Sequence, residues 1–224
     1  MKKLFLSFLS LAFTITSYSQ LPELIDSRIA AEQVAQGRPI PYATLEQLID
    51  SISPLDSDEE LLKLIGSVEL IDYEKDPIAF QRQGASAVDE FMEEFKSHGL
   101  VRDKALISLI LVRLKDLQVR DYAMGLSTPE NIDQQFNLWH WLMSIAPVGF
   151  LAPVACLFSA TAYESGEADL AHSALDKAFA DDLTYPLAIL LRRVFFANWP
   201  ADSFAAMRAQ LHPKICATLF GSSI

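Results

Sequence analysis

The sequence predicts an all-α protein, an irregular helical domain that ends in a tetratricopeptide-like helical hairpin. From residue 21 onward apolar residues recur with helical spacing, and no segment shows the alternation typical of a strand. The chain has only 8 glycines and contains no Asn-Gly or Asp-Gly pair, the usual signals of a tight β-hairpin. Hydrophobic residues make up 51% of the chain, which is ample material for a core.

Residues 1–20 have the pattern of a secretory signal peptide and are predicted to be a signal-like leader. Lys2 and Lys3 precede an apolar run over 4–15, and the small residues Ser17 and Ser19 follow at the positions that a signal peptidase prefers. The alternative is an ordinary buried helix or strand at the start of the domain. The apolar run is too short to span a membrane comfortably, and no later segment is a better span.

Residues 21–146 form the first region of the predicted domain. Its expected elements are helices over 24–36, 44–52 and 58–68, a polar loop over 69–84, and helices over 85–97, over 102–117 and from Thr128 onward. Gly37 ends the first helix, and Thr44 with Gln47 forms a capping box for the second. Ser57 with Glu60 forms the capping box of the third helix.

The later helices of this region differ in how much of their surface is apolar. Residues 85–97 carry apolar side chains on one face, whereas 102–117 is apolar nearly all round and is predicted to be a central buried helix. Thr128 followed by Pro129 is a good helix start, with threonine as the cap and proline in the first helical position.

Residues 147–224 form the second, C-terminal region of the same domain. We expect helices over 154–163, 168–180, 186–197 and 202–211, and a turn over 165–167. Gly166 allows the chain to reverse, while Ala171 and Ala178 allow two helices to approach closely, which is the spacing of a tetratricopeptide repeat. No second copy follows at a fixed period, so the pattern predicts one hairpin rather than a solenoid.

The charge and motif content exclude several classes of function. The formal net charge is −11 and no cluster of Lys and Arg occurs, which disfavours a nucleic-acid partner or an anionic membrane surface. The chain has no phosphate-binding glycine loop, no HExxH, no CxxC and no nucleophile elbow. We therefore predict no catalytic residue, metal ligand or cofactor, and the balance is against an enzyme.

Three segments together resemble one protein family. They are SRIAAEQVAQGRPIP (27–41), LKDLQVRDYAMGL with its Val-Arg-Asp motif (114–126), and the alanine-rich stretch from APVACLF to LLRRV (152–194). This set is similar to the bacterial domain of unknown function 4192, found mostly in actinobacteria. The resemblance implies a further α/β half at the N-terminus, which is missing here, so the chain looks like a shortened version. It also implies a cytoplasmic protein, whereas the leader indicates export, and it brings no activity or catalytic residue.

The candidate ligand-binding residues are Arg120, Asp121, Trp139 and His140. Arg120 and Asp121, with Asp116 one turn earlier, are either a binding trio or an ion pair that fixes a helix junction. His140 stands between Trp139 and Trp141, where it either contacts a ligand or packs beside core aromatics.

The leading functional hypothesis is a helical protein-interaction or scaffold module that binds another protein or a peptide, with Trp139, Trp141 and Trp199 as candidate exposed aromatics. The alternatives are an enzyme or small-molecule-binding domain with its site near Arg120 and Asp121, and a shortened family member that has lost its activity.

Two further clusters have simple structural interpretations. Asp169, His172 and Asp176 share one helix face and either hold a metal or form a solvated polar face. Cys156 and Cys216 each lie in an apolar helical context, which favours two buried free thiols and leaves a disulfide open in an exported protein.

Overall fold

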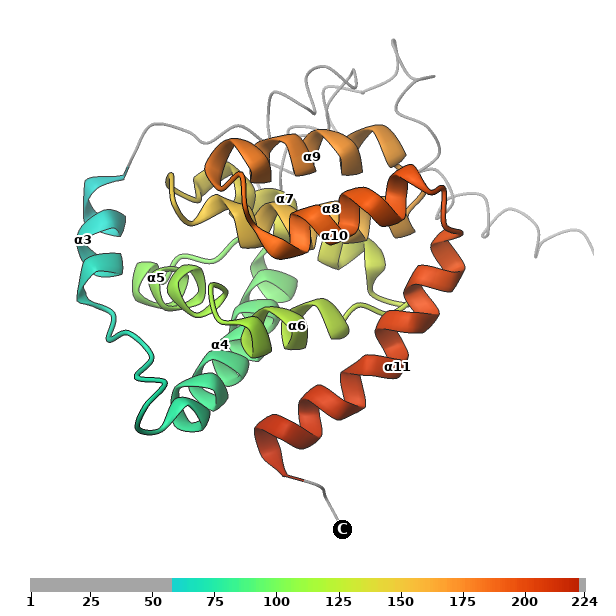
Figure 1. The fold of residues 1–224 in the computed structure, drawn as a ribbon. Coiled ribbons are helices and arrows are strands. Elements are labelled where there is room, and N and C mark those ends of the chain that lie inside the picture. The colour runs from blue at the N-terminus through green and yellow to red at the C-terminus, as the bar shows by residue number, and fades with distance from the viewer. Residues whose placement is uncertain (1–57, 222–224) are drawn as a thin grey trace, which may run out of the picture.

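In a computed structural model of the chain, residues 58–221 are described, and they confirm the all-α prediction (Figure 1). Nine helices and no strand occur in this part of the chain. They are α3 (Glu59–Ser67), α4 (Pro77–His98), α5 (Lys104–Arg113), α6 (Leu117–Gly125), α7 (Ile132–Ile145), α8 (Leu151–Glu164), α9 (Ala168–Asp181), α10 (Pro186–Phe196) and α11 (Ala201–Phe220). The predicted leader, the helices over 24–36 and 44–52, and Ser57 lie outside the described residues.

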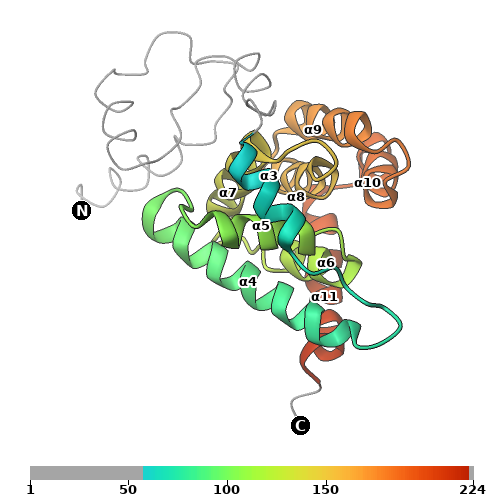
Figure 2. The ribbon, with the colours of Figure 1, turned by 90° about the vertical axis from the view of Figure 1, so that its left-hand side faces the viewer.

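Helix α8 is the centre of the fold. Every residue from Leu151 to Ala162 is buried, because α7, α9, α10 and α6 all pack against this helix. Helices α9 and α10 cover it on one side, α4, α5 and α6 form a second layer, and α11 runs along the edge of both (Figures 1 and 2). Among residues 58–221 no helix is long and apolar enough to cross a membrane.

The predicted hairpin of α8 and α9 is present. Gly166 adopts the left-handed φ of 82°, which glycine tolerates at little cost, and the N–H of Glu167 donates to the carbonyl of Ala162 at 2.9 Å to close the end of α8. Ala171 and Ala178 are fully buried. The small side chains therefore let α9 lie directly against α8, while the resemblance to a tetratricopeptide repeat stays a prediction.

Helix α4 begins much earlier than predicted. The polar loop expected over 69–84 ends at Asp76, whose side chain caps the helix by accepting a hydrogen bond from Ala79 N–H at 3.2 Å, and Pro77 occupies the first position. Residues 77–84 are helical although they include the polar run Gln81 to Gln83, because Gln81 is buried against a distant acid and Gln83 binds a buried arginine. The expectation of a loop over these residues is wrong.

The predicted central helix over 102–117 is present as α5, which is shorter than predicted. Helix α5 stops at Arg113, and α6 starts at Leu117 with Asp116 as its N-cap, which accepts hydrogen bonds from Gln118 N–H at 2.8 Å and Val119 N–H at 3.1 Å. Leu114 and Leu117 continue the apolar spacing past Arg113, so the pattern did not reveal the end of α5 at that residue.

Two other helix starts also differ from the prediction. Asp58, with hydrogen bonds from Glu60 N–H and Leu61 N–H, caps α3. Helix α7 begins at Ile132 rather than at the Thr128–Pro129 pair, since Thr128 N–H instead donates to the side chain of Asn131 at 2.7 Å in the preceding turn.

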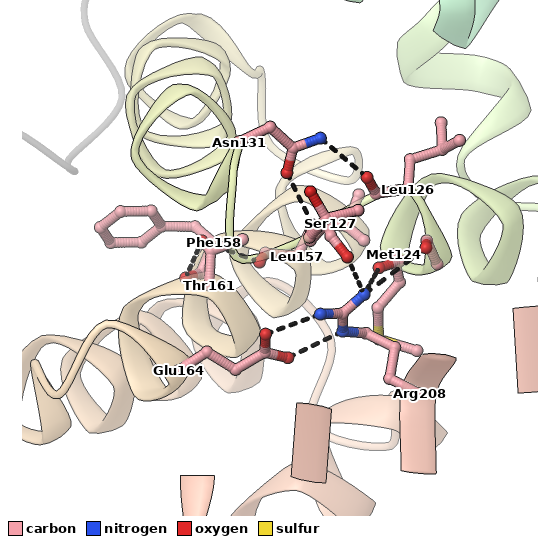
Figure 3. A network of polar contacts seen from close by, with 11 residues as sticks. Met124, Leu126, Ser127, Asn131, Leu157, Phe158, Thr161, Glu164 and Arg208 are labelled. Atoms are coloured by element: carbon pink, nitrogen blue, oxygen red, sulfur yellow. Dashed lines mark hydrogen bonds and ion pairs between the residues drawn. The ribbon is translucent and has the colours of Figure 1, made fainter. Parts of the chain in front are cut away.

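The last helix extends nine residues beyond its predicted end at 211, and one buried ion pair holds it (Figure 3). Arg208 binds Glu164 through two hydrogen bonds of 2.7 Å each. Its remaining terminal nitrogen donates to the carbonyls of Met124 at 3.2 Å and Ser127 at 2.5 Å. Arg208 therefore joins α11 to the end of α8 and to carbonyls in the last turn of α6 and just after it.

Candidate functional site

A pocket of about 540 Å³ lies where α3, the loop after it, and the α5–α6 junction meet. Figure 2 shows α3 in front of α5, with the following loop running past α6 to the start of α4. The pocket is lined by Ile65, Gly66, Val68, Leu70, Ile71, Tyr73, Val112, Arg113, Lys115, Asp116 and Phe150. This volume is typical of small-molecule sites, and the lining combines mostly apolar side chains with a few polar groups.

Arg113, the last residue of α5, is the buried cation of this pocket, with 1% of its surface exposed. Its guanidinium donates to Gln83 Oε1 at 3.2 and 2.9 Å and to the carbonyl of Glu69 at 2.7 Å, and lies 5.1 Å from the ring centre of Phe80. Burial lowers the pKa of Arg113. No carboxylate of residues 58–221 lies within ion-pair distance of its guanidinium.

Asp116 is the acid of the pocket, and both of its oxygens are already bound. Oδ1 accepts the two N–H groups at the start of α6, while Oδ2 accepts the hydroxyl of Tyr73 at 2.8 Å and the side-chain amide of Gln81 at 2.9 Å. Burial and the hydrogen bond to Asp116 raise the pKa of Tyr73 to about 12. Asp116 thus holds the loop, α4 and α6 together.

Lys115 and a set of exposed apolar side chains form the rim. The ammonium of Lys115 donates to the carbonyl of Gly149 at 3.2 Å and lies 4.8 Å from the ring centre of Phe150. Of the ten large apolar side chains exposed in the described residues, two, Leu70 and Tyr73, line the pocket. Exposed apolar side chains beside a pocket are typical of surfaces that contact another molecule.

The predicted residues Arg120 and Asp121 form an ion pair away from this pocket. Arg120 donates to Asp121 Oδ1 at 2.9 and 2.6 Å and to the hydroxyl of Tyr185 at 3.3 Å. Burial acts to lower the pKa of Arg120, but Tyr185 and Asp121 together raise it. Asp116 does not join this pair, so the suggested trio does not assemble, and the contacts tie α6 to the start of α10.

Trp139 and His140 lie in the core on α7. Trp139 is fully buried and stacks at 6.5 Å on Phe91, so the expectation that it is exposed is wrong. His140 lies against Phe136 and Phe158, and burial lowers its pKa to about 4. These two residues lie among core aromatics rather than beside Arg120.

The other candidate aromatics, Trp141 and Trp199, are only partly exposed. Trp141 packs on Phe91 and Phe95.

The residues of the two minor clusters, the helix face with His172 and the pair of cysteines, also do not come together as a site. His172 packs on Phe195 and Phe196, and Asp176 binds Arg192 at 2.6 Å. Within residues 58–221 no group of three histidine, cysteine or acidic residues gathers as a metal site. Cys156 is buried as predicted, Cys216 is partly exposed, and both thiols are free.

Comparison with known proteins places the chain in a family. The family described as "Domain of unknown function (DUF4192)" matches residues 20–201, most of the chain. The chain belongs to the DUF4192 family. The matched residues include every residue that lines the pocket. The match ends at the first residue of α11, so the rest of that helix lies outside the matched range. No curated protein and no solved structure matches the chain.

Sequence reasoning missed most of the pocket. Tyr73, Gln81 and Gln83 fell in the expected loop, and Arg113 fell within the expected central helix. One available signal was a charged residue, Arg113, in an otherwise apolar run, because a charge there needs partners from elsewhere in the chain.

Proposed function

We propose that this DUF4192 protein is a helical protein-interaction module and that the pocket beside α3 receives apolar side chains of its partner. One observation carries the proposal: the exposed side chains of Leu70 and Tyr73 line a preformed pocket whose wall is mostly apolar. Anchors that enter such pockets supply most of the binding energy in protein interfaces. The absence of any catalytic motif from the sequence also supports a binding role.

The contacts around Arg120 support a structural role for that residue. Arg120 binds its neighbour Asp121 and the hydroxyl of Tyr185, and these bonds join two helices. A ligand at Arg120 would compete with this ion pair. The pocket therefore supports a binding function better than the Arg120–Asp121 pair does.

A co-purification experiment with matched surface variants tests the proposal. The protein and two single variants, Leu70→Asp at the pocket and Leu183→Asp in the turn between α9 and α10, are tagged and recovered from their native cells. Both side chains are exposed, so both variants should fold, as circular dichroism would verify. We expect the protein and the Leu183→Asp variant to recover the same partner and the Leu70→Asp variant to lose it. Equal recovery by all three, or no partner and no self-association, would contradict the proposal.

A further inference from the structure

We infer that the pocket binds the carboxyl terminus of a partner polypeptide, taking the last apolar side chain against its apolar wall and the terminal carboxylate beside Arg113 and Lys115. This inference rests on the proposed function and adds the chemistry of the partner.

A comparison of the three buried arginines supports an anionic group at this position. Arg208 binds Glu164 and Arg120 binds Asp121 through direct ion pairs. Arg113 is as deeply buried as these two, yet its bonds within residues 58–221 go to two neutral oxygens, an amide and a backbone carbonyl. A buried cation normally has a direct counter-charge. Arg113 is the arginine of these three that has no carboxylate of the described residues within ion-pair distance, and it is also the one that lines the pocket.

The donors needed for a carboxylate are present. Arg113 has five N–H groups, and its three hydrogen bonds to described residues leave two for a further acceptor. Lys115 is exposed at the rim and bonds one carbonyl, so more of its ammonium protons are available. Asp116 does not accept hydrogen bonds from these donors, since four other hydrogen bonds already satisfy its two oxygens, while its charge and that of Glu69 act on Arg113 from beyond ion-pair distance.

The rest of the pocket fits an apolar side chain. Ile65, Val68, Ile71 and Phe150 form its apolar wall, and about 540 Å³ exceeds what one side chain fills. The ligand class is therefore an apolar group with a carboxylate close to it. Burial of a leucine-sized side chain contributes about 1.5–3 kcal/mol. Neither the apolar contact nor the carboxylate contact alone therefore gives a stable complex.

A chain terminus matches this chemistry better than an acidic residue inside a peptide. In an extended peptide, neighbouring side chains point to opposite faces, so an acid beside an apolar residue points away from the pocket that holds the apolar residue. The last residue of a chain carries its carboxylate on the same Cα as its side chain. Capture of a terminal carboxylate is also a recurrent mode of peptide recognition.

Head-group probes test the anionic preference first. Isothermal titration with sodium octanoate, octanol and octylammonium compares one apolar tail with three head groups. We expect octanoate to bind about tenfold more tightly than octanol and octylammonium not to bind. Equal binding of octanoate and octanol would overturn the carboxylate inference while leaving an apolar pocket, and hence the proposed function, intact.

Three peptides then distinguish the source of the carboxylate. They are acetyl-Ala-Ala-Leu-Leu with a free carboxyl terminus, the same peptide amidated, and amidated acetyl-Ala-Glu-Leu-Leu. We expect only the first to bind. Equal binding of the glutamate peptide would overturn the choice of a chain terminus. Binding of octanoate without any peptide would overturn the protein partner but not the carboxylate.

Variants show that binding occurs at this pocket. Lys115→Gln changes an exposed residue and should weaken octanoate binding about tenfold, whereas Lys214→Gln, an exposed lysine on α11, should leave it unchanged. Arg113→Gln should abolish binding, with circular dichroism and a thermal melt to verify folding. If Lys115→Gln and Lys214→Gln bind octanoate equally, the site is elsewhere and the inference fails.

Discussion

Replacement of Arg208 by methionine is the clearest test of how the C-terminal helix is held. Arg208 and Glu164 have side chains only 4% and 8% exposed, and two hydrogen bonds of 2.7 Å join them. Arg208 also donates to backbone carbonyls in the last turn of α6 and just after it. The change to methionine keeps most of the side-chain volume but leaves the Glu164 carboxylate buried without its cation.

The expected loss in the free energy of unfolding is about 3–5 kcal/mol, because one partner of a buried ion pair is then left uncompensated. Urea denaturation followed by circular dichroism measures this loss. Lys75→Met is the matched control: its ion pair with Asp72 has side chains 84% and 40% exposed, so the loss should stay below about 1 kcal/mol. The double variant Arg208→Met/Glu164→Met should recover much of the loss, since the uncompensated charge is gone. A loss for Arg208→Met no larger than that of Lys75→Met would refute this reasoning.

Three more predictions follow from single sites. Gly84→Ala should cost about 1–3 kcal/mol, since the added Cβ would lie 2.7 Å from a methyl of Val119, whereas Gly66→Ala on α3 meets no atom within 4 Å and should cost nothing; urea melts of both compare them. His140→Phe should flatten the pH dependence of stability. Because the pKa of His140 is lowered to about 4, the native protein loses up to about 3 kcal/mol of its free energy of unfolding as the pH falls from 6.5 toward 4. The same pH dependence in the protein and the variant would count against this. Tyr73, whose pKa is raised to about 12, should ionise later than an ordinary tyrosine in an ultraviolet titration, its contribution to stability being lost from pH 10 to 12, and Asp116→Asn should bring the transition closer to 10.

The sequence predicted the helices with local signals and missed the features that depend on distant partners. The turn at Gly166 and the helices on either side were correct, because the glycine and the alanine spacing act within a few residues. The polar run Gln81 to Gln83 looked like part of a loop, since its partners Arg113 and Asp116 lie 30 or more residues away along the chain. Helical periodicity also could not show that Asp116 caps a new helix that begins at Leu117.

The candidate site shows the same division. The sequence singled out the Val-Arg-Asp motif, and Arg120 and Asp121 do bind each other, as the structural alternative predicted. Trp139 appeared suited to a surface because of its type, but periodicity alone did not indicate that α7 turns it toward Phe91. The pocket depends on the loop after α3 meeting the α5–α6 junction, a tertiary contact that no local pattern encodes.

Photo-crosslinking in native cells most directly tests the claim that the pocket beside α3 is the interaction site. A crosslinking amino acid is placed at Leu70 on the pocket or at Leu190 on α10, both exposed positions. We expect a discrete crosslinked partner from position 70, joined through residues at its carboxyl terminus, and none of that product from position 190. The same product from both positions, or from 190 alone, would contradict it.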